Sequence, residues 1–144
     1  MRVGVPREIK VHEYRVGLTP EAVREYAAAG HEVLVETGAG AGISAPDSAY
    51  ETAGAKIAAS ASEVFSRAEL VVKVKEPQPQ EWAQLREGQI LFTYLHLAPD
   101  PEQTAGLLKS GVTAVAYETV TDKAGGLPLL APMSEVAGRL AIEA

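Results

Sequence analysis

The stretch of sequence that decides the fold is Leu70-Val71-Val72-Lys73-Val74-Lys75-Glu76-Pro77. Its apolar, β-branched start is typical of a strand that is buried on both faces of a parallel sheet. Pro77 has no N–H to donate to a neighbouring strand, so the strand should end at or before Glu76. Lys75 therefore stands where a buried strand opens into a loop. Because ligands bind outside the carboxyl ends of strands in open α/β sheets, Lys75 is a candidate for holding an anion or a carbonyl.

Short apolar runs of this kind alternate with amphipathic segments along the chain. We expect strands at residues 2–5, 31–36, 70–75, 90–95 and 113–117, and a short one within 55–59. Helices should start after three N-cap residues, Thr19, Ser60 and Asp100, each followed by proline or glutamate in the first turn. The alternation predicts an α/β fold, a mostly parallel βαβ sheet with flanking helices of the Rossmann-like or flavodoxin-like kind.

Composition narrows the classes of function. The 144 residues suffice for one domain with its own core, and 47% of them are hydrophobic and 22% charged. A net charge of −6 argues against a nucleic acid or an anionic membrane as partner. The sequence has no cysteine and no apolar run near the ~20 residues of a membrane span, and its three histidines lack the spacing of a zinc site. We therefore expect a cytoplasmic protein without a bound metal.

A glycine-rich stretch, Gly38-Ala39-Gly40-Ala41-Gly42, follows an expected strand, as a dinucleotide fingerprint would. The fingerprint needs a third glycine three residues after the second, opening a helix. Here the next helix should start only near Asp47, and no GxGxxG or phosphate-loop motif occurs elsewhere in these 144 residues. We therefore expect a loop at 38–42 and no dinucleotide fingerprint in the chain.

Four of the expected strands lead into polar or charged residues, which are Arg7-Glu8, Lys75-Glu76, Tyr94-Leu95-His96 and Tyr117-Glu118. The carboxyl ends of parallel strands share one edge of the sheet, so these groups could converge on one crevice. His96 is suited to general acid or base work because imidazole can carry a proton either way near neutrality. Arg15 adds a planar fork that suits a carboxylate. For any one of these residues alone we favour a solvated loop position; for Lys75 and His96 together we favour function.

Five blocks of the chain stand out together: GVPREIK at 4–10, RVGLTP at 15–20, VKVKEP at 72–77, FTYLHLA at 92–98 and PMSEVAGR at 132–139. In sequence and order they resemble the alanine dehydrogenase family over essentially the whole chain. The nucleotide-binding subunit of proton-translocating transhydrogenase is similar in the first block and the glycine loop, but it lacks counterparts of Lys75 and His96. Saccharopine dehydrogenase resembles these blocks less closely.

The resemblance implies an activity and a set of site residues. The activity would be the NAD-dependent, reversible oxidative deamination of L-alanine to pyruvate and ammonia by a homo-oligomer. Arg15 and Lys75 would hold the substrate carboxylate and carbonyl, and His96 would hydrogen-bond the reacting oxygen and transfer a proton. Ser134 and Met133 would approach the nicotinamide of the cofactor.

The resemblance also implies a division into domains. Residues 1–132 would form the substrate domain, incomplete in this chain, and residues 133–144 would start a helix that leads to an NAD-binding domain. We therefore expect the 144-residue chain to be catalytically inactive by itself. Three other interpretations stay open: a stand-alone small-molecule binding module, a saccharopine-dehydrogenase-like domain and a transhydrogenase-like domain.

Overall fold

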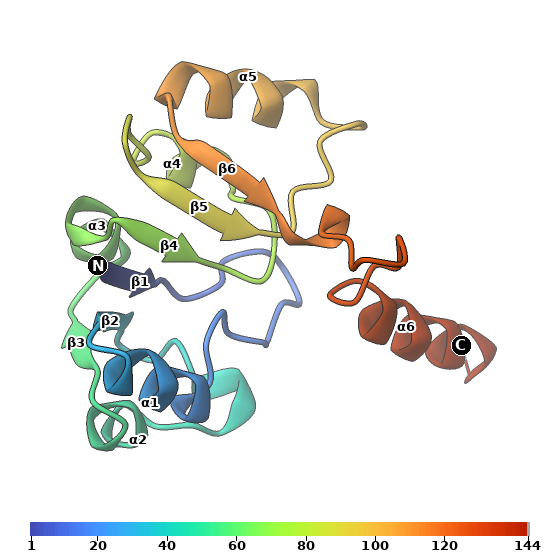
Figure 1. Ribbon diagram of the computed structural model, residues 1–144. Coiled ribbons are helices and arrows are strands. Elements are labelled where there is room, and N and C mark those ends of the chain that lie inside the picture. The colour runs from blue at the N-terminus through green and yellow to red at the C-terminus, as the bar shows by residue number, and fades with distance from the viewer. Residues whose placement is uncertain (144) are drawn as a thin grey trace.

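A sheet of six parallel strands organises residues 1–143, the part of the chain that the computed structural model describes (Figure 1). The strands are β1 (Arg2–Val5), β2 (Glu32–Glu36), β3 (Lys56–Ala58), β4 (Leu70–Val72), β5 (Ile90–Thr93) and β6 (Thr113–Ala116). Their order is β3-β2-β1-β4-β5-β6 and every neighbouring pair is parallel. The expected α/β fold is confirmed, and the order is that of a Rossmann-type sheet, which reverses direction between β1 and β4.

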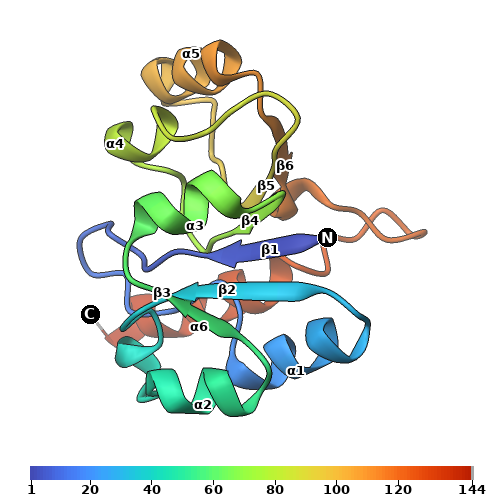
Figure 2. The ribbon, with the colours of Figure 1, turned by 90° about the vertical axis from the view of Figure 1, so that its left-hand side faces the viewer.

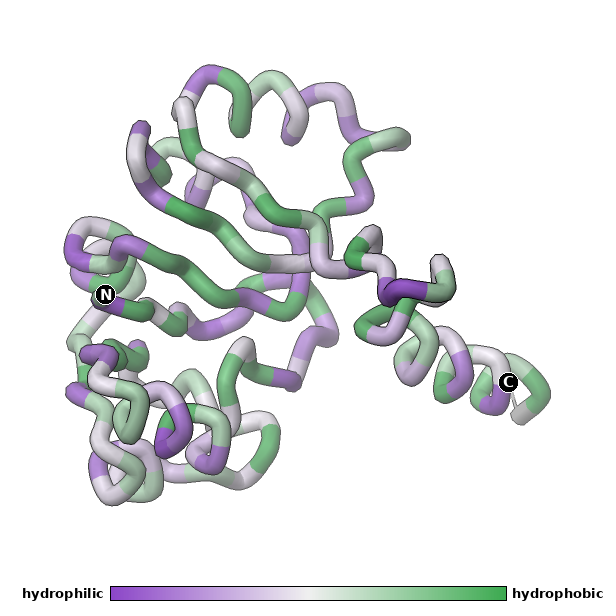
Figure 3. The backbone as a smooth tube through the Cα atoms, in the orientation of Figure 1, coloured by the Kyte–Doolittle hydropathy of each residue, from purple (hydrophilic) through white to green (hydrophobic). Residues whose placement is uncertain are grey.

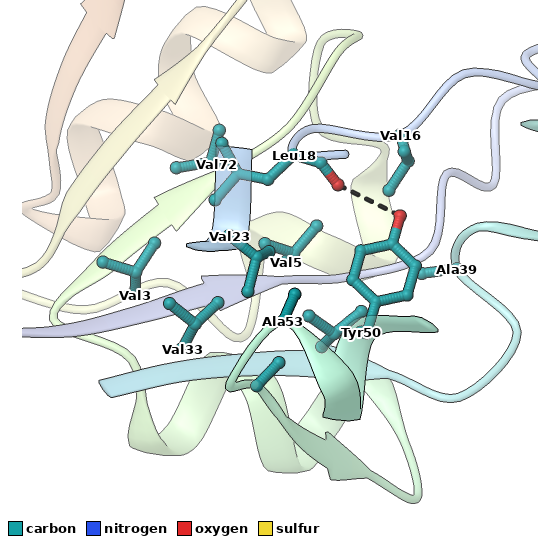
Figure 4. Close-up of a cluster of buried hydrophobic side chains, with 12 residues drawn as sticks. Val3, Val5, Val16, Leu18, Val23, Val33, Ala39, Tyr50, Ala53 and Val72 are labelled. Carbon is teal, nitrogen blue, oxygen red and sulfur yellow. Dashed lines mark hydrogen bonds between the residues drawn. The ribbon is translucent and has the colours of Figure 1, made fainter. Parts of the chain in front are cut away.

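Helices pack on both faces of the sheet because alternate strand residues point to opposite sides (Figure 2). On one face α1 (Pro20–Ala28) and α2 (Asp47–Thr52) cover the valines of β1 and β2, and the Tyr50 hydroxyl donates to the Leu18 carbonyl at 3.1 Å (Figure 4). On the other face α3 (Ala61–Arg67) and α5 (Pro101–Ser110) cover Val71 and Leu91. The short helix α4 (Pro79–Trp82) packs beside α5.

All three expected N-caps are confirmed. Each cap side chain accepts from a backbone N–H three residues on: Thr19 from Ala22 at 3.4 Å, Ser60 from Glu63 at 3.3 Å and Asp100 from Gln103 at 2.9 Å. Gly111 ends α5 with a φ of +69°, a conformation that glycine adopts without a steric penalty. Two single 3₁₀ turns, η1 (Ala41–Ile43) and η2 (Tyr117–Thr119), follow β2 and β6.

Four strands are shorter than expected: β2 and β6 each by one residue, and β4 and β5 by three and two. β4 ends at Val72 rather than at 75, and β5 ends at Thr93 rather than at 95. Toward the segment after β1 the hydrogen-bond partner changes, because the backbone N–H of Val74 donates to the carboxylate of Glu8 and not to a strand carbonyl. The sequence showed the apolar run but not the distant carboxylate that accepts the N–H of Val74.

The last helix, α6 (Ala131–Glu143), lies beyond the carboxyl ends of the strands (Figure 1). It begins two residues before the expected boundary at 133, and Ala144 lies outside the described residues. Apolar residues recur along it (Figure 3), and the side chains of Val136, Leu140 and Ile142 are exposed. The first turns of α6 stand opposite the strand ends, so this helix completes the candidate site.

Candidate functional site

The candidate site lies at the carboxyl ends of β1 and β4, where the strand order reverses. Gly4 pairs with Val71, so the segments that follow these two strands leave the sheet side by side. The first carries Glu8 and Arg15, and the second begins at Lys73. A crevice at such a reversal is the general ligand position in open α/β sheets.

The backbone of residues 73–75 is fixed by groups from several strand ends. Lys73 N donates to Phe92 O at 3.1 Å, Val74 N to Glu8 Oε1 at 2.7 Å, Tyr117 Oη to Val74 O at 2.5 Å, and Thr93 Oγ1 to Lys75 O at 2.8 Å. These partners follow or belong to β1, β5 and β6. Lys75 is therefore mounted on a backbone whose position is set by the sheet, although it lies three residues past the end of β4.

Lys73 is the centre of a buried charge cluster, which we call the Lys73 cluster and which consists of Glu8, Lys73 and Glu81. Lys73 Nζ lies 3.1 Å from Glu8 Oε2 and 2.9 Å from Glu81 Oε1, and the three side chains are at most 3% exposed. Burial raises the pKa of Glu8, and the charge and hydrogen bond of Lys73 oppose that rise. Sequence reasoning missed this cluster. Its only local signal was a lysine between valines in an apolar strand.

The Lys75 side chain has other neighbours than that of Lys73 and lines a cavity. Its Nζ lies 4.9 Å from the centre of the Tyr94 ring, within the range of a cation–π interaction. The Tyr117 ring packs edge-on against Tyr94, with ring centres 6.1 Å apart. Burial raises the pKa of Tyr117 to about 12, so its hydroxyl stays a hydrogen-bond donor to Val74 throughout the neutral range. The two tyrosines give Lys75 an aromatic wall.

Arg15 is paired with Glu13, a residue that the sequence had not singled out. Glu13 Oε1 accepts from Arg15 Nε at 2.8 Å, and Glu13 Oε2 accepts from Nη2 at 2.6 Å. The remaining Nη1 lies 3.7 Å from Met133 Sδ on α6. The pairing raises the pKa of Arg15 and lowers the pKa of Glu13. The guanidinium therefore bridges the loop after β1 and the first turn of α6.

Four of the residues predicted for the site line one cavity of about 360 Å³. They are Arg15, Lys75, Met133 and Ser134, and the remaining lining residues are Tyr94, Tyr117, Leu130, Val136, Ala137 and Leu140. Arg15 and Lys75 are its charged lining residues, and apolar side chains from α6 face them. We call it the Arg15–Lys75 cavity. Its chemistry suits a small ligand with a carboxylate at one end and an apolar group at the other.

His96 lies next to this cavity but not in its lining. The residue is exposed and has a φ of +48°, and its backbone N–H donates to Glu118 Oε1 at 2.9 Å. Its ring centre is 5.9 Å from that of Tyr94, which does line the cavity. His96 is thus connected to the cavity through Tyr94, whereas the other four predicted residues line the cavity themselves.

The glycine-rich stretch has a packing role. Gly42 lies so close to the Tyr14 carbonyl that a Cβ atom there would overlap it, and a Cβ on Gly40 would overlap Ala45 and Tyr50. The segment forms the 3₁₀ turn η1 rather than the start of a phosphate-binding helix. Gly42 therefore lets the turn pack against the backbone next to Arg15.

Residues 1–143, which the structure describes, were also compared with the requirements of a metal site and of a membrane-spanning helix. Within them, no group of three or more histidine, cysteine or acidic side chains is arranged to hold a metal ion. Nor does any helix of this range combine the length and apolarity needed to cross a membrane.

Comparisons with known proteins agree with one another. The family model described as "Alanine dehydrogenase/PNT, N-terminal domain" matches residues 4–137. Alanine dehydrogenase of Halomonas elongata is 55% identical over 144 residues, which are 100% of this chain and 39% of that protein. A solved L-alanine dehydrogenase structure superposes with a TM-score of 0.94 at 52% identity, over 99% of this chain and 39% of that one. A transhydrogenase from Sinorhizobium meliloti reaches a TM-score of 0.79 at 29% identity, over 85% of this chain and 36% of that one. The chain thus spans about two fifths of the length of the relatives it matches.

Proposed function

The chain belongs to the alanine dehydrogenase/PNT N-terminal domain family, and from this premise we propose that its Arg15–Lys75 cavity binds the substrate of an NAD-dependent L-alanine dehydrogenase. The reaction would be the reversible oxidative deamination of L-alanine to pyruvate and ammonia. One observation carries the proposal: two cations from distant parts of the chain line one small cavity opposite apolar side chains. A carboxylate and a methyl group, which alanine and pyruvate share, match those two walls.

In this proposal each residue of the chain has a distinct task. Arg15 holds the substrate carboxylate, because its fork can donate to both oxygens. Lys75 donates to the carbonyl oxygen of pyruvate, and its fixed backbone and the Tyr94 ring limit where the ammonium can lie. His96, at the rim, transfers the proton that accompanies loss or gain of ammonia. Holding the carboxylate and the carbonyl at two points orients the α-carbon for reaction.

Met133 and Ser134 are suited to contact a nicotinamide ring. Both line the Arg15–Lys75 cavity from α6, Met133 half-buried and Ser134 exposed, so a flat ring could approach the substrate from that side. When bound, NAD supplies the acceptor for the hydride of the α-carbon. The 144 residues contain no GxGxxG motif, and the relatives are more than twice as long. We therefore propose that the dinucleotide is held mainly by residues outside this chain, and that the chain alone has no turnover.

A pyruvate titration tests the proposal. Adding pyruvate to the ¹⁵N-labelled 144-residue chain should shift the amide signals of residues around the cavity in a saturable way. Lys75→Met should abolish these shifts, and Lys123→Met, a matched change in an exposed loop, should leave them unchanged. Absence of saturable shifts in the unmodified chain would refute the proposed substrate site.

A second set of measurements separates the remaining interpretations. A full-length protein that carries this domain should reduce NAD with L-alanine and lose that activity in Lys75→Ala or His96→Ala. Activity with saccharopine instead of L-alanine would favour the saccharopine-type alternative. The transhydrogenase alternative has weaker support, since both the identity and the TM-score are lower for that relative. If the chain binds pyruvate but has no full-length form, the stand-alone binding module is the interpretation that remains.

We extend the proposal to self-association. The exposed side chains of Val136, Leu140 and Ile142 on α6 give the chain apolar surface that a second copy could cover. Sedimentation velocity of the 144-residue chain, with Ile142→Glu as the test variant, should show a dimer or larger species that the variant lacks. A monomer at all concentrations would contradict this part of the proposal.

A further inference from the structure

Glu13 occupies one edge of the Arg15 guanidinium with both of its carboxylate oxygens. Oε1 accepts from Nε at 2.8 Å and from the backbone N–H of Arg15 at 2.9 Å, and Oε2 accepts from Nη2 at 2.6 Å. The Glu13 side chain is 7% exposed, whereas that of Arg15 is 50% exposed. A carboxylate enclosed by the loop therefore fixes an arginine whose other side is open.

The open side of Arg15 faces the Arg15–Lys75 cavity. The guanidinium has five N–H donors in one plane, and Glu13 uses those of Nε and one of Nη2. Both N–H groups of Nη1 and the second one of Nη2 remain, and Nη1 lies 3.7 Å from Met133 Sδ in the cavity wall. Two parallel N–H groups of this kind form the edge that receives a carboxylate in a bidentate pair.

We propose that Glu13 is a positioning residue for substrate binding, which turns Arg15 so that its Nη1–Nη2 edge points into the cavity. This inference rests on the proposed function and deepens it by naming a residue that positions Arg15 for the substrate carboxylate. Glu13 itself does not touch the ligand; it acts through Arg15. Its carboxylate also balances the charge of Arg15 before any ligand binds. Arg15 therefore contributes to ligand binding more through the orientation of its N–H groups than through a net positive charge.

Loss of Glu13 has two opposing consequences for an anionic ligand. Arg15 keeps its charge but becomes free to adopt other rotamers, which must be restricted again when the ligand binds. At the same time a negative charge that repels the ligand disappears. Because the bidentate edge must be aligned for a strong pair, we expect the loss of orientation to dominate, so Glu13→Ala should weaken pyruvate binding about fivefold.

The test compares pyruvate dissociation constants of the 144-residue chain by NMR titration. Glu13→Ala should bind about fivefold more weakly than the unmodified chain, and Glu13→Gln, which keeps an oxygen for Arg15 Nε, should recover part of the loss. Glu25→Ala, which removes an exposed carboxylate on α1, is the control for net charge and should bind normally. In an Arg15→Lys background, which lacks the planar fork, Glu13→Ala should have no further effect. Equal or tighter binding by Glu13→Ala, or the same loss in both backgrounds, would overturn the inference.

A ligand-free measurement keeps this inference separate from the proposed function. The Nε–H signal of Arg15 should be visible and slow to exchange in the unmodified chain, because Glu13 protects it, and should be lost in Glu13→Ala while the urea midpoint changes little. If the unmodified chain does not bind pyruvate, the proposed function fails whatever this signal does. If it binds pyruvate but the Nε–H signal is unprotected, the positioning role alone fails.

Discussion

Lys73 and Glu8 form an ion pair at 3.1 Å in the interior, with side chains that are 0% and 2% exposed. The same Glu8 carboxylate accepts the backbone N–H of Val74 at 2.7 Å. The pair thus joins the segment after β1 to the segment after β4 at the point where the strand order reverses. Apolar packing could hold these segments together, but hydrogen bonds with fixed directions also set their register. That register determines where Lys75 enters the Arg15–Lys75 cavity.

Replacing Lys73 by methionine should strongly destabilise the protein. The change keeps the apolar stem but leaves the carboxylates of Glu8 and Glu81 buried without a cation. Removing one partner of a buried ion pair costs about 3–5 kcal/mol. Urea unfolding followed by circular dichroism measures the loss. The control is Lys56→Met, whose lysine pairs with Glu32 at 3.0 Å but is 68% exposed, and which should change stability by less than about 1 kcal/mol.

The pH dependence of the Lys73→Met variant follows from Glu8. Burial raises the pKa of Glu8 above its usual 4.5, and Lys73 opposes that rise, so the variant should raise it further. A carboxyl with a raised folded pKa is most favourable below its unfolded pKa, and this contribution disappears as the pH rises through the folded value. The stability deficit of the variant should therefore shrink as the pH falls toward 4.5. A deficit that is constant across this range would show that the buried carboxylates do not cause it.

Because the pKa of Tyr117 is raised in the folded protein, we expect the protein to lose stability in alkali. Its folded pKa of about 12 lies above the ordinary 10.0, so its contribution is present below pH 10.0 and disappears as the pH rises toward about 12. Tyr117→Phe removes the donor to Val74 and should cost about 1 kcal/mol at neutral pH. Between pH 10.0 and about 12 the variant should lose less stability than the unmodified chain. Tyr14→Phe, at an exposed tyrosine, is the control and should behave as the unmodified chain in both ranges.

Elements whose signals are local could be predicted from the sequence. The start of α5 is marked by Asp100 and its end by Gly111, and both act within a few residues. The end of β4 could not be predicted in this way, because the backbone N–H of Val74 donates to the carboxylate of Glu8, which is 66 residues away. The pattern of valines shows that a strand is buried but not which side chain replaces its last hydrogen bonds.

The same distinction between local and long-range signals applies to the residues of the candidate site. Arg15, Lys75, Met133 and Ser134 could be named because the motifs around them resemble a family, and the structure brings these four to one cavity. Glu13, only two residues from Arg15, could not be named from the sequence, because a glutamate in a charged loop has no signal that distinguishes an orienting pair from a solvated one. Burial of its side chain, which depends on the surrounding loops, supplies that distinction.

Gly42→Ala should disturb the site without touching a charged group. A Cβ atom at this position would overlap the carbonyl of Tyr14, so the loop that carries Arg15 must shift. We expect a loss of about 1–3 kcal/mol in stability together with weaker pyruvate binding. Gly138→Ala, on α6 in open space, is the matched control and should be neutral or stabilising by up to about 1 kcal/mol. Unchanged pyruvate affinity in Gly42→Ala would show that this packing does not position Arg15.

His96 has a backbone conformation that its own side chain disfavours. Its φ of +48° lies in the left-handed region, which costs a non-glycine residue of this kind about 1 kcal/mol or more. The carboxylate of Glu118 holds the turn by accepting from the N–H groups of both Leu95 and His96. Such strain is retained where a side chain is needed at that place, which agrees with a role for the imidazole at the rim of the cavity.

Glycine at position 96 should therefore give a more stable but functionally impaired protein. His96→Gly removes the strain and the imidazole together, whereas His96→Ala removes the imidazole and keeps the strain. We expect His96→Gly to be more stable than His96→Ala by about 1 kcal/mol in urea unfolding, the reverse of the usual order at positions with negative φ. Leu97 is an exposed neighbour without a positive φ and is the control: Leu97→Gly should be less stable than Leu97→Ala. In a full-length protein both His96 variants should lose turnover alike. If His96→Gly were the less stable of the two, the left-handed backbone at this residue would not be strained by its side chain.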